Sequence, residues 1–167
     1  MSELATAIRQ IQTARDYSND LLDNVPDEAW FQMPDGHVSH IAWQAGHLAV
    51  CEYGLALKRI RGSQPGDDEL VNADAFQLFG KGSVPVADAT TYPTVAEIRA
   101  LMSRVHEQVI SELESLDESV LSESSTDPPH RMFSTKGGSL TWCAQHEFLH
   151  AGQIGLLRRQ AGEKWLR

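Results

Sequence analysis

Two histidines, His146 and His150, are four residues apart in a segment whose apolar pattern predicts a helix. On an α-helix this spacing places two side chains on the same face, one turn apart. Two imidazole rings placed in this way can hold one divalent metal ion. The alternative is that one ring lies in the core and the other faces solvent.

Together with Glu147, the pair forms an H-E-x-x-H sequence, the signature of zinc metalloproteases. Its continuation does not fit that class, because Gln153 and Leu156 stand where the extended motif has glycine and histidine. The sequence also predicts no strand to hold a peptide substrate. We therefore do not expect a protease. Glu147 is a candidate catalytic base, but it could instead orient a metal ligand or form a salt bridge with a neighbouring helix.

A third ligand is expected from another helix, and His47 is the candidate. It belongs to a polar stripe that must face either water or an internal site, formed by His40, Gln44, His47 and Cys51. In this stripe, Gln44 could hydrogen-bond a bound ligand or orient a histidine. His40 is the uncertain member, because it lies two turns before His47 on nearly the same face.

Glycines accompany both histidine segments, although a glycine in a helix interior costs about 1 kcal/mol relative to alanine. They indicate either close approach of two helices or room for a ligand. The four positions are Gly46, Gly54, Gly152 and Gly155.

The two cysteines, Cys51 and Cys143, each lie one turn from a candidate ligand. A closed structural zinc site of cysteines and histidines is therefore an alternative, but the short cysteine spacings typical of such sites are absent. We interpret both cysteines as small buried residues near the site. The remaining histidines are predicted to lie on the surface: His37, His106 and His130.

Proline and hydrophobic periodicity predict the elements that must position these side chains. All seven prolines fall in three stretches, and the segments between them show a 3.6-residue apolar period. We predict an all-α protein: a four-helix bundle in a single domain, residues 1–167, with helices over 2–22, 39–61, 94–116 and 139–161. The connections 62–93 and 117–138 are predicted loops, with a short helix near 72–79. The first is long enough to be a crossover between parallel second and third helices.

Local signals mark the ends of these helices. Ser2 is a candidate N-cap, and Thr94 with Glu97 matches the capping box. Gly62 and Gly162 are predicted to end the second and fourth helices. The cations before them are explained as helix-end charges: Lys58, Arg59, Arg61, Arg158 and Arg159.

Composition excludes several classes of function. The 167 residues contain 14 lysines and arginines against 23 acidic residues, a net charge of −9, so nucleic acid is not an expected partner. No run approaches the roughly eighteen apolar residues of a membrane span. The N-terminal segment has no apolar secretory region, and two cysteines make no disulfide framework. We expect a cytoplasmic protein.

Three segments of the sequence resemble the DinB-like superfamily, in particular the branch also seen as the N-terminal domain of ergothioneine-pathway sulfoxide synthases. The first is Ile41-Ala-Trp-Gln-Ala-Gly-His47-Leu-Ala, and the second is His146-Glu-Phe-Leu-His150-Ala-Gly-Gln153-Ile with Arg158-Arg159. The third is Phe79-Gly-Lys-Gly-Ser83, followed by Tyr92-Pro-Thr94.

The resemblance implies a four-helix bundle with a long crossover, often a homodimer, and one divalent ion of zinc, nickel or iron. Its ligands would be His47, His146 and His150. Gln44 and Gln153 become candidates for contact with substrate or with a metal ligand. Characterised relatives include transferases and isomerases that use bacillithiol, mycothiol or glutathione, and many others have no assigned activity.

Three hypotheses follow. The leading one is a metal-dependent enzyme, a thiol-dependent transferase or a hydrolase, that acts on a small molecule. It is favoured because three imidazole ligands leave open positions on a metal ion. The second is a metal-binding bundle without catalysis, acting as a sensor, carrier or stress-response protein. The third is a bundle whose histidines are only core and surface residues.

Overall fold

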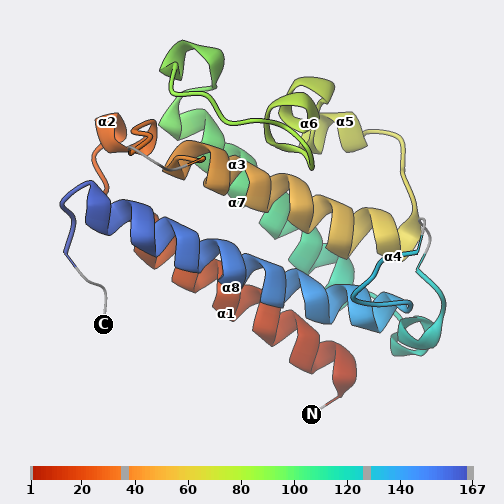
Figure 1. Ribbon diagram of the computed structural model, residues 1–167. Helices are drawn as coiled ribbons and strands as arrows, with labels where there is room; N and C mark the ends of the chain where they lie inside the picture. Colours follow the sequence, from red (N-terminus) through yellow and green to blue (C-terminus); the bar gives the residue numbers. More distant parts are fainter. Residues whose placement is uncertain (1, 35–37, 126–128, 165–167) are drawn as a thin grey trace.

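The computed structural model describes residues 2–34, 38–125 and 129–164. The described residues form helices and no strand, apart from two isolated bridges, so the prediction of an all-α fold is confirmed. Four long helical segments lie side by side (Figure 1). They begin with α1 (Glu3–Leu22), α3 (Ile41–Glu52), α7 (Val95–Glu114) and α8 (Lys136–Gln160).

The second long segment is one helix in three parts. After α3 it continues through a π-helical stretch, Tyr53–Lys58, into α4 (Arg59–Arg61), and it ends at Gly62 with a φ of 79°. It starts two residues later than predicted because His40 is its N-cap. The Nδ1 atom of His40 accepts a hydrogen bond from the backbone N of Trp43 at 3.2 Å. His40 therefore leaves the polar stripe to which the sequence assigned it.

The predicted caps of the first and third segments are confirmed. The Ser2 hydroxyl accepts a bond from the backbone of Ala5 at 3.2 Å. Thr94 and Glu97 form a complete capping box in which each side chain bonds the backbone of the other. Such caps satisfy backbone groups that the first turn of a helix leaves unpaired.

The fourth segment starts at Lys136, so the interpretation of Gly137 and Gly138 as loop residues was wrong. Thr135 caps the helix by accepting a bond from the backbone of Gly138 at 3.1 Å. A side chain at Gly137 would come within 2.9 Å of the Glu3 carboxylate. The Glu3 side chain can move away, but the same Cβ atom would also lie 3.2 Å from the backbone oxygen of Leu121, so Gly137 is closely packed within the helix and does not form a turn.

The contacts fix the direction of each helix. Arg15 and Leu21 of α1 approach Glu147 and Gly155 of α8 in the same order, so the two helices are parallel. Gln44 bonds Gln153, and Leu55 farther along the same segment bonds Ser139, so α3 and α8 are antiparallel. On α7, His106 meets Glu52 and Glu112 meets Arg61, so α3 and α7 are parallel, as the long link between them predicts.

The link itself carries two short α-helices, α5 (Asp67–Leu70) and α6 (Ala73–Phe79), and a 3₁₀ helix, Ala89–Thr91. Helix α6 confirms the short helix predicted there. A further short helix, α2 (Asp27–Trp30), precedes α3. Helix α6 packs on α3, where Phe79 is fully buried against Gly46. A Cβ atom at Gly46 would lie 2.5 Å from the Phe79 ring, so this glycine permits the close approach.

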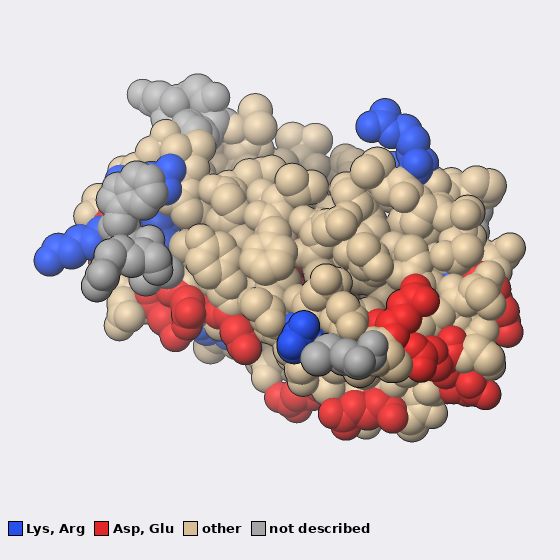
Figure 2. Space-filling view, turned by 90° about the horizontal axis from the view of Figure 1, so that it is seen from below, with Lys and Arg blue, Asp and Glu red and all other residues tan. Residues whose placement is uncertain are grey.

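The side of the molecule formed by α1 and α8 has few charges at its centre (Figure 2). Acidic side chains lie along the lower edge and at the right of this view, and Lys or Arg side chains lie at its left end and upper right. Large apolar side chains are exposed on these two helices: Tyr17, Phe148, Leu149 and Leu156. Across the described part of the chain, no helix combines the length and apolar character needed to cross a membrane.

Candidate metal centre

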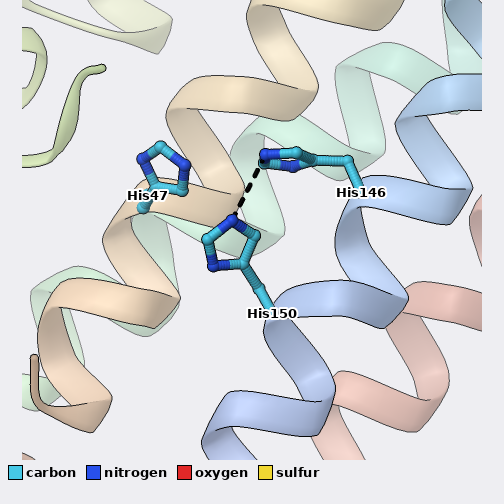
Figure 3. Close-up of side chains that lie close together, drawn as sticks. All are labelled: His47, His146 and His150. Atoms are coloured by element: carbon cyan, nitrogen blue, oxygen red, sulfur yellow. Dashed lines mark hydrogen bonds between the residues drawn. The ribbon is translucent and has the colours of Figure 1, made fainter. Parts of the chain in front are cut away.

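Three histidines converge between α3 and α8 and form the three-histidine cluster: His47, His146 and His150 (Figure 3). One ring nitrogen from each lies within 4.8 Å of the other two. The Nε2 atoms of His146 and His150 are 3.2 Å apart. Two nitrogens that bind one tetrahedral zinc ion at about 2.0–2.1 Å lie roughly 3.3 Å apart, so this pair has the separation of two ligands. The structure thus brings together the residues that the resemblance implies.

A backbone carbonyl and an indole ring hold His47 in place. Its Nδ1 lies 2.6 Å from the carbonyl oxygen of Phe79, so Nδ1 donates the proton and Nε2 keeps its lone pair. The Trp43 ring stacks on His47, with centroids 4.6 Å apart and an angle of 11° between the planes. Helix α6 therefore determines which nitrogen of His47 is free to bind a metal.

Two glutamines, Gln44 and Gln153, determine which nitrogen of His150 is free. Its Nδ1 donates to the Oε1 of Gln44 at 2.5 Å, which leaves Nε2 as the acceptor. The Nε2 of Gln44 donates in turn to Ser39 at 2.8 Å and to Gln153 at 2.9 Å. Gln44 and Gln153 thus lie one and two hydrogen bonds from a candidate ligand, where hydrogen bonds usually fix the ring of a metal-binding histidine.

The cluster is electrically neutral at physiological pH. Burial, with the neighbouring histidines, lowers the pKa of His146 to about 4 and that of His150 to about 3. Burial also lowers the pKa of His47, although the Phe79 carbonyl opposes this. Neutral imidazole is the form that binds metals. Because the Nε2 of His150 accepts, the neutral His146 ring donates its Nε2 proton to it, and His146 would have to carry that proton on Nδ1 to bind a metal through Nε2.

Glu147 lies beside His146 in sequence but faces α1. Its two oxygens accept bonds from Nε and Nη2 of Arg15 at 2.8 and 3.2 Å, and only 2% of the residue is exposed. Of the three roles that the sequence leaves open for Glu147, these contacts support the salt bridge. Its role as a catalytic base stays a prediction, which the contacts disfavour.

Arg15 joins Glu147 to a larger group, the buried charge cluster: Arg15, Glu52, His106 and Glu147. The Nη2 of Arg15 lies 2.8 Å from Glu52, and the Nδ1 of His106 lies 2.6 Å from the other oxygen of Glu52. His106 is 18% exposed, so its assignment to the surface was wrong. No role was predicted for Arg15 from the sequence. The available signal was Glu52, a carboxylate on the apolar stripe of its helix, because a buried carboxylate needs a cation.

The two cysteines have different surroundings. The Sγ of Cys51 lies 3.3 Å from the Nε2 of His47, and burial raises the pKa of this thiol to about 12. Cys143 is buried beside the charge cluster, and burial raises its pKa as well. Only the ring nitrogens of His47, His146 and His150 form the close group of ligand atoms found among the described residues.

The other histidines lie outside the cluster. His40 is a buried N-cap, as described above, and not a ligand. His130, which was predicted to lie on the surface, is half-buried, and its ring stacks on Phe133 with centroids 4.4 Å apart. His37 lies outside the described residues.

Comparison with known proteins supports the resemblance. A family model described as the DinB superfamily matches residues 10–154, a range that includes all three histidines of the cluster. Among curated proteins, none matches the sequence.

Proposed function

The chain belongs to the DinB superfamily, and from this premise and the three-histidine cluster we propose that it is a divalent-metal-dependent enzyme that acts on a small molecule. The reaction is thiol transfer or hydrolysis, and the ion is zinc, nickel or iron. The observation that supports this most directly is the convergence of three neutral ring nitrogens, within 4.8 Å of one another, from two helices.

The roles of the residues follow from their contacts. His47, His146 and His150 hold the ion, which when bound can lower the pKa of a water molecule or hold a thiol as thiolate. The Phe79 carbonyl and Gln44 fix the rings of His47 and His150. Trp43 covers one face of His47 and limits access of water from that side. Three protein ligands leave positions for substrate, as in catalytic and not in structural sites.

Metal analysis tests the first step of this proposal. We expect about one divalent ion per chain, and we expect His47→Ala, His146→Ala and His150→Ala to lose it. His130→Ala is the matched control, because it removes a half-buried histidine outside the cluster and should retain the metal. A parent protein that takes up no metal on titration would leave the histidines as core and surface residues.

Glu147→Gln separates binding from folding. Because Glu147 pairs with Arg15 and not with the histidines, this variant should keep its metal and lose stability. If the variant lost its metal at unchanged stability, Glu147 would have a role in metal binding, and the proposed salt-bridge role would be wrong.

A test for turnover separates the enzyme from the alternative, a metal-binding stress-response or sensor protein. The metal-loaded parent and His47→Ala are incubated with low-molecular-weight thiols plus acceptors, and with ester and amide libraries. Turnover by the parent alone supports the enzyme. A metal-loaded parent without turnover in either set supports the non-catalytic protein.

The partners are also proposals. We propose that the protein does not bind nucleic acid, because of its net charge of −9. We also propose a homodimer that forms at the side of α1 and α8, whose exposed apolar residues include Phe148 and Leu156. These two lie four residues on either side of Gly152, so an antiparallel two-fold contact centred there would bring them together. Light scattering should show a dimer for the parent and a monomer for Phe148→Glu.

A further inference from the structure

The loop of residues 80–83 is attached to the metal centre at both ends. Before it, the Phe79 carbonyl accepts the bond from His47 at 2.6 Å. At its end, the Ser83 hydroxyl accepts a bond from the indole N of Trp43 at 2.9 Å, and Trp43 stacks on His47. The position of this loop is therefore coupled to a metal ligand.

The loop is a tight turn in which only Lys81 presents a side chain between the two ends. The backbone N of Ser83 donates to the carbonyl of Gly80 at 3.1 Å, which closes a four-residue turn. Gly82 has a φ of 93°, the conformation that type II turns require at their third position. At Gly80, a Cβ atom would collide with the carbonyl oxygen of Phe76. The two glycines thus fix the backbone on either side of Lys81.

Positive charges gather on the side of the cluster that contains His146. The Trp142 ring lies 6.1 Å from that of His146 and 6.1 Å from that of His130. Burial lowers the pKa of His130, and the charges of Arg59, Lys81 and Arg131 lower it further, so all three cations act on this ring.

Two of these cations have no counter-charge within the described residues. The side chains of Lys81 and Arg131 are exposed and form no hydrogen bond or ion pair there, whereas Arg59 lies over the Phe133 ring and bonds Ser125. In a chain with a net charge of −9, this is an unusual concentration of positive charge. A divalent ion on the histidines would add to it, so the local potential favours anions.

We propose that Lys81 and Arg131 select small molecules that carry an anionic group, a carboxylate, sulfonate or phosphate, and hold that group while another atom of the molecule reaches the metal centre. This inference rests on the proposed function, because it assigns the substrate class of the same site. Lys81 acts as a charge on a flexible stem, so it recognises the anion without demanding one geometry.

The test uses protein loaded with cobalt and two thiols that differ in charge, 2-mercaptoethanesulfonate and 2-mercaptoethanol. Sulfonate is a poor metal ligand, so both thiols bind the cobalt through sulfur alone. A difference between their affinities therefore reports the effect of the negative charge. Affinity is measured from the visible spectrum of the cobalt at low ionic strength. We expect the sulfonate to bind roughly five- to tenfold more tightly, in line with one or two ion pairs near the surface.

Lys81→Gln and Arg131→Gln should each remove part of this preference and leave the affinity for 2-mercaptoethanol unchanged. Lys164→Gln, which removes an exposed lysine beyond the far end of α8, is the matched control and should keep the preference. Equal affinities in the parent, an unaltered preference in both variants, or no spectral change with either thiol would overturn the inference. Failure to take up cobalt would be a failure of the proposed function instead.

Discussion

The buried charge cluster takes its side chains from all four long helices, whereas the three-histidine cluster lies between α3 and α8. The two clusters differ in how their polar atoms are satisfied. In the buried charge cluster, the guanidinium of Arg15 meets the carboxylates of Glu52 and Glu147, each at 2.8 Å. In the three-histidine cluster, lowered pKa values keep the rings neutral, and the nitrogens face one another. His146 and Glu147 are adjacent in sequence, and each belongs to a different cluster.

The electrostatics of Arg15 show that the buried charge cluster is complete within the protein. Burial alone would lower the pKa of Arg15, but Glu52 and Glu147 raise it above its ordinary value. Burial raises the pKa of Glu147, and Arg15 opposes that change. Each charge is thus stabilised by an opposite charge from another helix. The rings of the three-histidine cluster are instead neutral, and they bond neutral groups: the Phe79 carbonyl, Gln44 and each other.

The largest expected effect is that of Arg15→Met on stability. This change leaves two buried carboxylates without their cation, and breaking a buried pair in this way costs about 3–5 kcal/mol. The free energy of unfolding, measured by urea denaturation, should fall by this amount, while the metal-binding residues stay intact. Arg9→Met, on the exposed side of α1, is the control and should change stability by about 0.5 kcal/mol or less. A similarly small loss of stability for both variants would contradict a stabilising role of the buried charge cluster.

Gly46→Ala should have the next largest effect, because it acts on both stability and metal binding. The added methyl group would lie 2.5 Å from the Phe79 ring, whose residue also supplies the carbonyl that orients His47. Overpacking of this kind costs about 1–3 kcal/mol, and displacement of Phe79 should weaken metal affinity as well. Gly54→Ala is the matched control on the same helical segment, since nothing lies within 4 Å of its added methyl. Equal behaviour of the two variants in thermal unfolding and metal titration would contradict this coupling.

Acid should destabilise the metal-free protein through the three-histidine cluster. The pKa values of His146 and His150 are lowered from 6.5 to about 4 and about 3, so the unfolded chain takes up protons first as the pH falls. The contribution of these rings is therefore complete above pH 6.5 and is lost as the pH falls towards 4. We expect a loss of about 2 kcal/mol, or roughly 4–8 °C in unfolding temperature, after allowance for partial exposure. We would measure the unfolding temperature of the metal-free protein as a function of pH. His146→Gln should weaken its dependence on pH, and His130→Gln should change that dependence less.

The helices and the histidine pair could be predicted from the sequence because their signals are local. The 3.6-residue period, the capping box of Thr94 and Glu97, and Gly62 are all read within a few residues. The spacing of His146 and His150 requires only helical geometry to bring their rings together. His47 needed the resemblance, because no local rule connects it to the other two.

The remaining features depend on contacts between distant segments. Arg15 and Glu147 are 132 residues apart, and neither spacing nor periodicity pairs them. The start of α8 at Lys136 goes with the Thr135 cap and with close packing of Gly137 against the Leu121 backbone, although glycine has a low helix propensity. His106 was placed on the surface because its position lies off the apolar stripe, yet Glu52 of α3 draws it inward. For Arg15 and His106, a long-range polar contact decided the outcome.

The smallest expected effect is that of Gln153→Ala, and it tests how far support for the three-histidine cluster extends. Gln44 bonds His150 directly, so Gln44→Ala should weaken metal affinity about 10- to 100-fold, as is usual when the residue that orients a ligand is lost. Gln153 only supports Gln44, which Ser39 also holds, so its loss should cost less than roughly tenfold. Gln145→Ala, at another exposed position of α8, is the control and should bind metal as the parent does. If Gln153→Ala weakened affinity as much as Gln44→Ala, support would not decline with distance from the ring. The exposed end of the network would then be as necessary as its buried part, and the cluster would depend on its surface much more than the buried charge cluster does.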